Sequence, residues 1–203
     1  MTAILAIDTA TGPCSVAIWH NGRVSAYVEN RAPVMQSASL VPMVEEALKQ
    51  AGLGYRDLAT VACTTGPGSF TGIRVGLATA SGIAFASSIK GIGFTTLEVM
   101  AFAARKHAAP AQAVLALLNA GKGEYYYQCF PGGEPRLAAL EQALADAGAG
   151  ALIASNVPSI ANCDVTFPRA DALAELAATS HASAALAPFY IRPPDAKLPA
   201  GKC

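Results

Sequence analysis

The sequence predicts an α/β protein built around a mixed sheet. Three strand patterns open the chain, and a helix, a strand and a second long helix follow them before residue 90. Strands and helices then alternate again in the second half of the chain. Because consecutive strands favour hairpins and alternating strands and helices favour layered α/β units, this order indicates a mixed sheet covered by helices.

The first three strands are predicted from apolar patterning and turn chemistry. Residues 3–8 are an apolar run, residues 14–19 alternate, and residues 23–29 follow a turn. Asn21 and Gly22 form that turn, since both central residues of a type I′ turn need positive φ. We therefore expect a hairpin between the second and third strands.

The first helix is expected to begin at Ser37 or Ser39 and to run to Gln50. A serine at the N-cap satisfies a free backbone N–H group, and Gly52 suits the end of a helix. Pro42 is tolerated only in the first turn of a helix, which favours Ser39 as the cap.

The remaining elements complete two lobes. A strand is expected at residues 59–64 and a long helix at residues 70–88. In the second half, strands are expected at residues 114–118, 124–130 and 151–155, and helices at residues 137–147 and 171–178. We expect an N-terminal lobe, residues 1–100, with a glycine-rich loop and two long helices, and a smaller C-terminal lobe, residues 101–203, whose tail after Pro188 is extended.

Composition excludes several classes of function. About half of the chain is apolar (53%), 14% is charged, and the formal net charge is zero. A protein that grips nucleic acid by itself needs an excess of Lys and Arg, which this chain lacks. Residues 75–89 are the best membrane candidate, but they are short for a span and contain Ser and Thr, so we expect a buried helix and no membrane partner.

Cysteine usage indicates a cytoplasmic protein. The five cysteines are widely spaced, their number is odd, and no Cys-x-x-Cys motif occurs. The short apolar run before Asp8 does not have the length of a signal-peptide core. These features predict reduced thiols in the cytoplasm.

The most informative segment is the glycine-rich block from Thr64 to Gly76. Gly66, Pro67 and Gly68 separate the strand at 59–64 from the long helix. A strand that enters a helix through such a loop presents free N–H groups, which suit either an anion or a tight packing joint. The loop is no Walker motif, since no Gly-Lys-Ser/Thr follows it.

Several motifs, taken in order, resemble the TsaB (YeaZ) family. They are residues 4–11 (Ile-Leu-Ala-Ile-Asp-Thr-Ala-Thr), residues 39–43 (Ser-Leu-Val-Pro-Met) and residues 66–74 (Gly-Pro-Gly-Ser-Phe-Thr-Gly-Ile-Arg). Shorter matches follow at residues 123–126 and 188–192. The resemblance implies two ribonuclease-H-like lobes of the actin/Hsp70/sugar-kinase (ASKHA) superfamily, with the second lobe reduced.

The resemblance also implies a function in tRNA processing. TsaB resembles a degenerate TsaD, and the implied role is a noncatalytic subunit that binds and activates TsaD for threonylcarbamoyl transfer to the adenosine beside the tRNA anticodon. The implied partners are TsaD in a heterodimer, TsaE in a larger complex, tRNA through the complex, and a second copy in a homodimer when the chain is alone.

No resident metal or cofactor is expected. The catalytic relative holds its metal with a His-x-x-x-His pair, which His20, His107 and His181 cannot form. Gln36 stands where the family often has a histidine, and Asn119 and Gly121 replace an expected Asp and Arg.

Two degenerate phosphate loops are the candidate nucleotide contacts, and we expect them to bind weakly. Ala10 stands where such loops normally have glycine. Asp8 either caps its own turn or contributes to a metal–water shell. The six candidate residues are Asp8, Thr9, Thr11, Gly66, Gly68 and Ser69.

Two helices offer candidate partner contacts. Each carries an apolar or small-residue face that is either core or a docking surface, and the sequence leaves both interpretations open. The resemblance implies that TsaB proteins pair through these helices. The candidate residues are Leu40, Met43, Val44, Ala47, Val75, Gly76, Thr79, Ala80 and Ile83.

Two alternative functions remain open. One is a small ATP-dependent phosphotransferase or a peptidase of the same superfamily, although Ser69 lacks a Gly-x-Ser-x-Gly elbow. The other is a self-sufficient homodimeric regulator.

Overall fold

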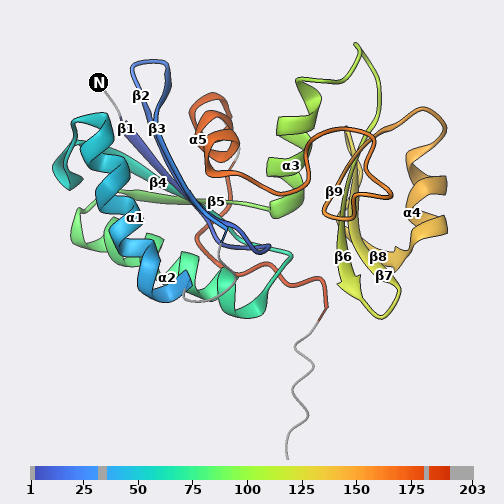
Figure 1. Cartoon of the computed structure of the whole chain (residues 1–203), viewed down its shortest axis with the longest axis horizontal. Coiled ribbons are helices and arrows are strands. Elements are labelled where there is room, and N and C mark those ends of the chain that lie inside the picture. Colours follow the sequence, from blue (N-terminus) through green and yellow to red (C-terminus); the bar gives the residue numbers. More distant parts are fainter. Residues whose placement is uncertain (1–2, 32–35, 181–182, 193–203) are drawn as a thin grey trace, which may run out of the picture.

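Two sheets and five helices form successive layers in the computed structural model, which describes residues 3–31, 36–180 and 183–192 (Figure 1). The first sheet contains β1 (Ala3–Asp8), β2 (Cys14–His20), β3 (Arg23–Asn30), β4 (Leu58–Thr64) and β5 (Lys90–Phe94), in the order β3-β2-β1-β4-β5. The second contains β6 (Val114–Gly121), β7 (Glu124–Phe130), β8 (Arg136–Ala139) and β9 (Leu152–Ser155), in the order β8-β7-β6-β9.

The two sheets share one topology, which confirms the predicted fold class. In the first, β1–β2 and β2–β3 are antiparallel, whereas β1–β4 and β4–β5 are parallel. In the second, β6–β7 and β7–β8 are antiparallel and β6–β9 is parallel, so the described second lobe repeats the first without its last strand. Both lobes are ribonuclease-H-like, and the second is the reduced one.

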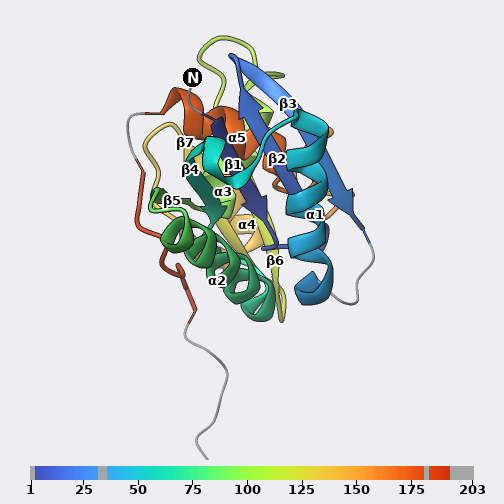
Figure 2. The same cartoon turned by 90° about the vertical axis from the view of Figure 1, so that its left-hand side faces the viewer.

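The helices of the described residues form three layers: one outside the first sheet, one between the two sheets and one outside the second sheet. Helices α1 (Gln36–Ala51) and α2 (Phe70–Ala86) lie on one face of the first sheet (Figure 2). Helices α3 (Thr96–Arg105) and α5 (Ala170–Thr179) fill the space between the two sheets, and α4 (Leu140–Ala147) covers the outer face of the second. A short 3-10 helix, η1 (Tyr55–Asp57), precedes β4.

Local sequence explains the opening hairpin. Asn21 has φ 54° and Gly22 has φ 76°, which confirms the turn that their residue types predict.

Strand β1 is buried on both faces: Leu5 and Ile7 pack toward α1 and α2, and Ile4 and Ala6 pack toward α5. A continuous apolar run is therefore what this central strand requires.

The predicted start of the first helix is wrong. Helix α1 begins at Gln36, and Pro42 lies inside it, one turn later than the sequence argument allowed. Pro42 removes one backbone hydrogen bond. The side chains that α1 buries against the sheet, Leu40 and Val44 among them, stabilise the helix despite this loss.

Other differences concern the second half. Residues 136–139 form strand β8, so the helix predicted from residue 137 begins at Leu140. The division at residue 100 stays a proposal; it falls within α3, and α5 packs on the first sheet rather than the second. Among the helices in the described ranges, none has the length and apolarity that crossing a membrane requires.

Candidate functional site

Asp8 lies at the end of β1 and is completely buried. The Thr64 hydroxyl donates a hydrogen bond to its Oδ1 at 2.6 Å, and the Ala10 N–H donates to the same oxygen at 3.3 Å. Its Oδ2 has no hydrogen-bond partner among the described residues. Burial, which penalises the charged form, raises the pKa of Asp8 to about 7. The carboxyl group therefore holds a proton well above the ordinary range of an aspartate, and it does not face solvent.

The two candidate phosphate loops contact each other directly. The Ser69 N–H donates to the Ala10 carbonyl oxygen at 2.6 Å, and the Thr9 hydroxyl donates to the Gly72 carbonyl oxygen at 2.7 Å. The Ser69 hydroxyl caps α2 by accepting from the Gly72 N–H at 3.2 Å. The Ser69 N–H group and the Ser69 hydroxyl oxygen thus both form hydrogen bonds within the fold.

Glycine is required at this joint because the backbones approach closely. A Cβ atom at Gly68 would overlap the Ala10 carbonyl oxygen, and one at Gly76 would overlap the Thr9 hydroxyl. Of the candidate nucleotide contacts, Asp8, Thr9 and Gly66 are buried, Thr11 is half-buried, and Gly68 and Ser69 are exposed. The geometry favours the tight strand–helix joint over the anion cradle.

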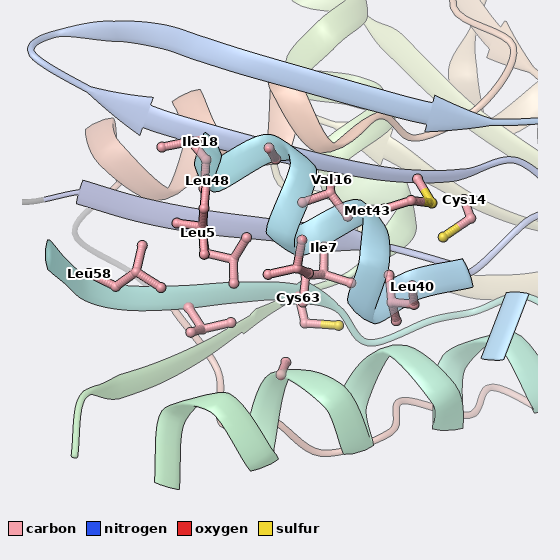
Figure 3. Packing of buried hydrophobic residues seen from close by; sticks show 14 of the residues in the cluster. Leu5, Ile7, Cys14, Val16, Ile18, Leu40, Met43, Leu48, Leu58 and Cys63 are labelled. Atoms are coloured by element: carbon pink, nitrogen blue, oxygen red, sulfur yellow. The ribbon is translucent and has the colours of Figure 1, made fainter. Parts of the chain in front are cut away.

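The candidate docking residues divide into two groups. Leu40, Met43, Val44 and Ala47 are all buried against the first sheet, as Figure 3 shows for Leu40 and Met43 beside Ile7 and Val16. On α2, Gly76 and Ala80 are buried as well. These six residues belong to the core of the single chain, because both helices are apolar on the side that faces the sheet. Their docking role has no support in this geometry and stays a prediction.

The other three candidates lie at the rim of the buried face. Val75, Thr79 and Ile83 on α2 are half-exposed. The large apolar side chains that do face solvent on these helices are Val41 (47% exposed), Phe70 (40%) and Phe85 (89%). Sequence reasoning missed these three. A helical wheel anchored on the buried Ile73, Leu77 and Ala84 would have placed Phe85 outside the core.

The departures at residues 119 and 121 have a local structural role. The Asn119 side-chain oxygen accepts from the Gly121 N–H at 2.7 Å, and Gly121 has φ 77°. The Asn119 N–H donates to the Asn156 side chain at 2.9 Å, which ties the β6–β7 hairpin to the segment after β9. Asn119 and Gly121 therefore shape a turn. Glu124, at the start of β7, forms an ion pair with Arg192.

A groove of ≈ 840 Å³ opens between β3, α3, α5 and residues 164–167. Cationic side chains on its wall pair with neighbouring carboxylates: Arg31 with Glu29, Lys106 with Glu175, and Arg169 with Asp171. Because these pairs neutralise their own charges, they offer little attraction to a phosphate group.

The histidine and cysteine side chains in the described ranges lie apart from one another or inside the core. His20 ends β2, and His107 is exposed near the groove. The side chain of Gln36, the whole of His181 and Cys203 lie outside the described residues. Among the residues described, no three His, Cys, Asp or Glu side chains gather closely enough to hold a metal ion, and the four cysteines are free thiols.

Comparison with known proteins assigns the family. The model of the family described as "TsaD: tRNA N6-adenosine threonylcarbamoyltransferase" matches residues 35–189. The tRNA threonylcarbamoyladenosine biosynthesis protein TsaB of Escherichia coli (strain K12) is 43% identical over 125 residues, which are 61% of this chain and 53% of that protein. The chain belongs to this family, in its TsaB (YeaZ) group. It spans about half the length of the curated relatives it matches.

Solved structures of the TsaB (YeaZ) group have the same fold. A Pseudomonas aeruginosa protein described as similar to the peptidase YEAZ is 26% identical, with a TM-score of 0.83 over 95% of this chain and 100% of that one. The structure of YeaZ from Pseudomonas aeruginosa is 27% identical, with a TM-score of 0.74 over 94% and 100% of the two chains. TsaB family members are tRNA threonylcarbamoyladenosine biosynthesis proteins.

Proposed function

We propose that this chain is a noncatalytic cytoplasmic subunit that binds TsaD and activates it for threonylcarbamoyl transfer to the adenosine beside the tRNA anticodon. In this proposal TsaE joins the complex, tRNA is bound through the complex, and a second copy takes the place of TsaD when the chain is alone. Membership of the family supports a role in threonylcarbamoyladenosine biosynthesis. The geometry of residues 8–11 and 66–69 supports a noncatalytic role for this chain.

The observation that carries the noncatalytic role is the closed joint between residues 8–11 and 66–69. The loops that would hold a nucleotide in a phosphotransferase are bonded to each other through Ser69 and Ala10. If the chain were a peptidase, Ser69 would be its candidate nucleophile, but this side chain caps α2. Neither alternative enzyme gains support from these contacts.

Solvent-exposed apolar side chains support the docking role. Val41 lies on α1 and Phe85 on α2, and these helices lie side by side on one face of the first sheet (Figure 2). Half-exposed Val75, Thr79 and Ile83 extend the apolar area of α2. We propose that this outward surface, the docking face, contacts TsaD.

A reconstituted transfer assay tests the proposal. Threonylcarbamoyl-adenylate and unmodified tRNA are supplied to this chain, to TsaD from the same cell, or to both. Modified adenosine is expected only when TsaD is present, with a marked increase on adding the chain. Turnover by the chain alone would overturn the noncatalytic role, and a rate with TsaD that the chain does not change would overturn activation.

A further inference from the structure

Residues 183–192 connect the first sheet to the second lobe. Ala184 pairs with Gly93 of β5: the Gly93 N–H donates to the Ala184 carbonyl at 2.8 Å, and the Ala184 N–H donates back at 3.0 Å. Further along, the Phe189 N–H donates to the Thr65 carbonyl at 2.8 Å. Figure 1 shows this segment passing from the first sheet to the tip of the β6–β7 hairpin.

Glycines make room for this segment. A Cβ atom at Gly93 would lie 2.6 Å from the Ala185 carbonyl oxygen, and one at Gly91 would overlap the Leu186 side chain. A Cβ at Gly66 would lie 2.6 Å from the Phe189 carbonyl oxygen. Glycine weakens a strand, so two of them in the short strand β5 indicate that close approach of residues 183–192 is part of the fold.

The segment also contributes to the surface of α2. The Tyr190 ring stacks on Phe70 with 5.5 Å between centroids, and Arg74 Nε donates to the Tyr190 hydroxyl at 3.3 Å. The Arg74 guanidinium lies 3.8 Å from the centre of the Phe70 ring. These contacts tie Tyr190 to the exposed first turns of α2.

Arg192 joins the segment to the second lobe. Its guanidinium forms an ion pair with Glu124 and donates to the Ala120 carbonyl oxygen at 3.2 Å. The Arg192 side chain is 18% exposed and the Glu124 side chain is 43% exposed, so water reaches the carboxylate and screens the pair in part. The two short family-like segments of the second half, residues 123–126 and 188–192, therefore meet in space.

We propose that residues 183–192 are a strap that holds the second lobe in a fixed position relative to the docking face, with the Glu124–Arg192 ion pair as its latch. Release of the latch frees the end of the strap, loosens Tyr190 from Phe70, and changes the surface that α2 offers to a partner. This coupling rests on the proposed docking of TsaD, whereas the strap and latch themselves do not.

Hydrogen exchange measured by mass spectrometry on the full chain tests the latch. Arg192→Gln and Glu124→Gln remove the ion pair, and Glu134→Gln, an exposed site in the same lobe, is the matched control. Exchange at the Phe189 amide is expected to rise about three- to tenfold in both latch variants. The Ala184 amide should change little, because its own bridge to β5 is intact. The double variant should match Arg192→Gln.

Two exchange results would overturn the latch. One is exchange at Phe189 within about twofold of the parent chain. The other is an equal rise throughout the chain, since that reports general destabilisation rather than release of the strap.

TsaD affinity, measured by calorimetry with the same variants, tests the coupling. Arg192→Gln is expected to weaken binding at least about threefold, the size of a partly buried ion pair, with no change in the control. If the latch variants release the strap and still bind normally, the coupling is wrong. If Val41→Asp and Phe85→Asp also bind TsaD normally, the proposed docking face is wrong. The hydrogen-exchange result alone then tests whether residues 183–192 act as a strap.

Discussion

Replacing Asp8 with asparagine should remove a pH dependence of stability that the buried carboxyl group creates. Burial raises the pKa of Asp8 to about 7 in the folded chain, against about 3.9 for an unfolded aspartate. The folded state therefore holds the proton more tightly than the unfolded state does. This contribution to stability is fully present below about pH 4 and is lost as the pH rises through the folded pKa near 7.

The magnitude follows from the difference between the two pKa values. About three pH units at about 1.4 kcal/mol each give a total loss of about 4 kcal/mol by pH 8, of which roughly 2 to 3 kcal/mol falls between pH 5 and pH 8. Burial raises the pKa of Cys14 to about 12 and that of Cys63 further, so these neighbouring thiols stay protonated throughout. The hydrogen bond from the Tyr127 hydroxyl lowers the pKa of Asp146, so titration of this group changes the stability only at more acidic pH.

Urea unfolding at pH 5 and pH 8 measures the effect in the parent chain, in Asp8→Asn and in Asp164→Asn, an exposed control. Asparagine keeps an acceptor for the Thr64 hydroxyl, and any cost of burying its NH₂ group is the same at both pH values. The free energy of unfolding should fall by roughly 2 to 3 kcal/mol in the parent and the control, and this part of the fall should vanish in Asp8→Asn. Equal pH dependence in all three would show that Asp8 does not titrate in this range.

Three further predictions concern the joint and the docking face. Gly68→Ala should lower the free energy of unfolding by about 1 to 3 kcal/mol, because its Cβ atom would meet the Ala10 carbonyl group. Gly82→Ala, at a site on α2 with open space around it, should be neutral or stabilising. Thermal unfolding of both variants and the parent chain measures the difference. Val41→Asp and Phe85→Asp should stay folded by circular dichroism and lose TsaD in gel filtration. Leu144→Asp, at a site on α4 that is 39% exposed, should retain TsaD; retention by all three variants would place the interface elsewhere. Calorimetry with ATP and Mg²⁺ should show weak or no binding to the chain alone, and a dissociation constant below about 1 μM would contradict the closed joint.

Sequence determined the features that depend on neighbouring residues. The Asn21–Gly22 turn and the strands on either side follow from turn chemistry and alternation. The long helix after the glycine block was predicted from its own residues, and the structure adds that Ser69 caps it. Strand β5 was not predicted, because Gly91 and Gly93, which make room for residues 183–192, depress strand propensity.

Sequence left open which face of each helix is core. Leu40 and Val44 form an apolar stripe whether it meets a sheet or a partner, and only the packing of α1 on the sheet shows that both are buried. The start of α1 was misjudged for a similar reason, since packing against the sheet outweighs the local cost of Pro42.

Tertiary structure alone decided the state of the candidate site. Sequence motifs placed Asp8 and Ser69 in two separate loops, but the burial of one and the backbone bond of the other to Ala10 arise only when β1 and α2 come together. Arg192 and Glu124 lie 68 residues apart, and no local pattern pairs them. Such contacts depend on chain topology, because the energy that stabilises them comes from groups that the sequence separates and the fold assembles.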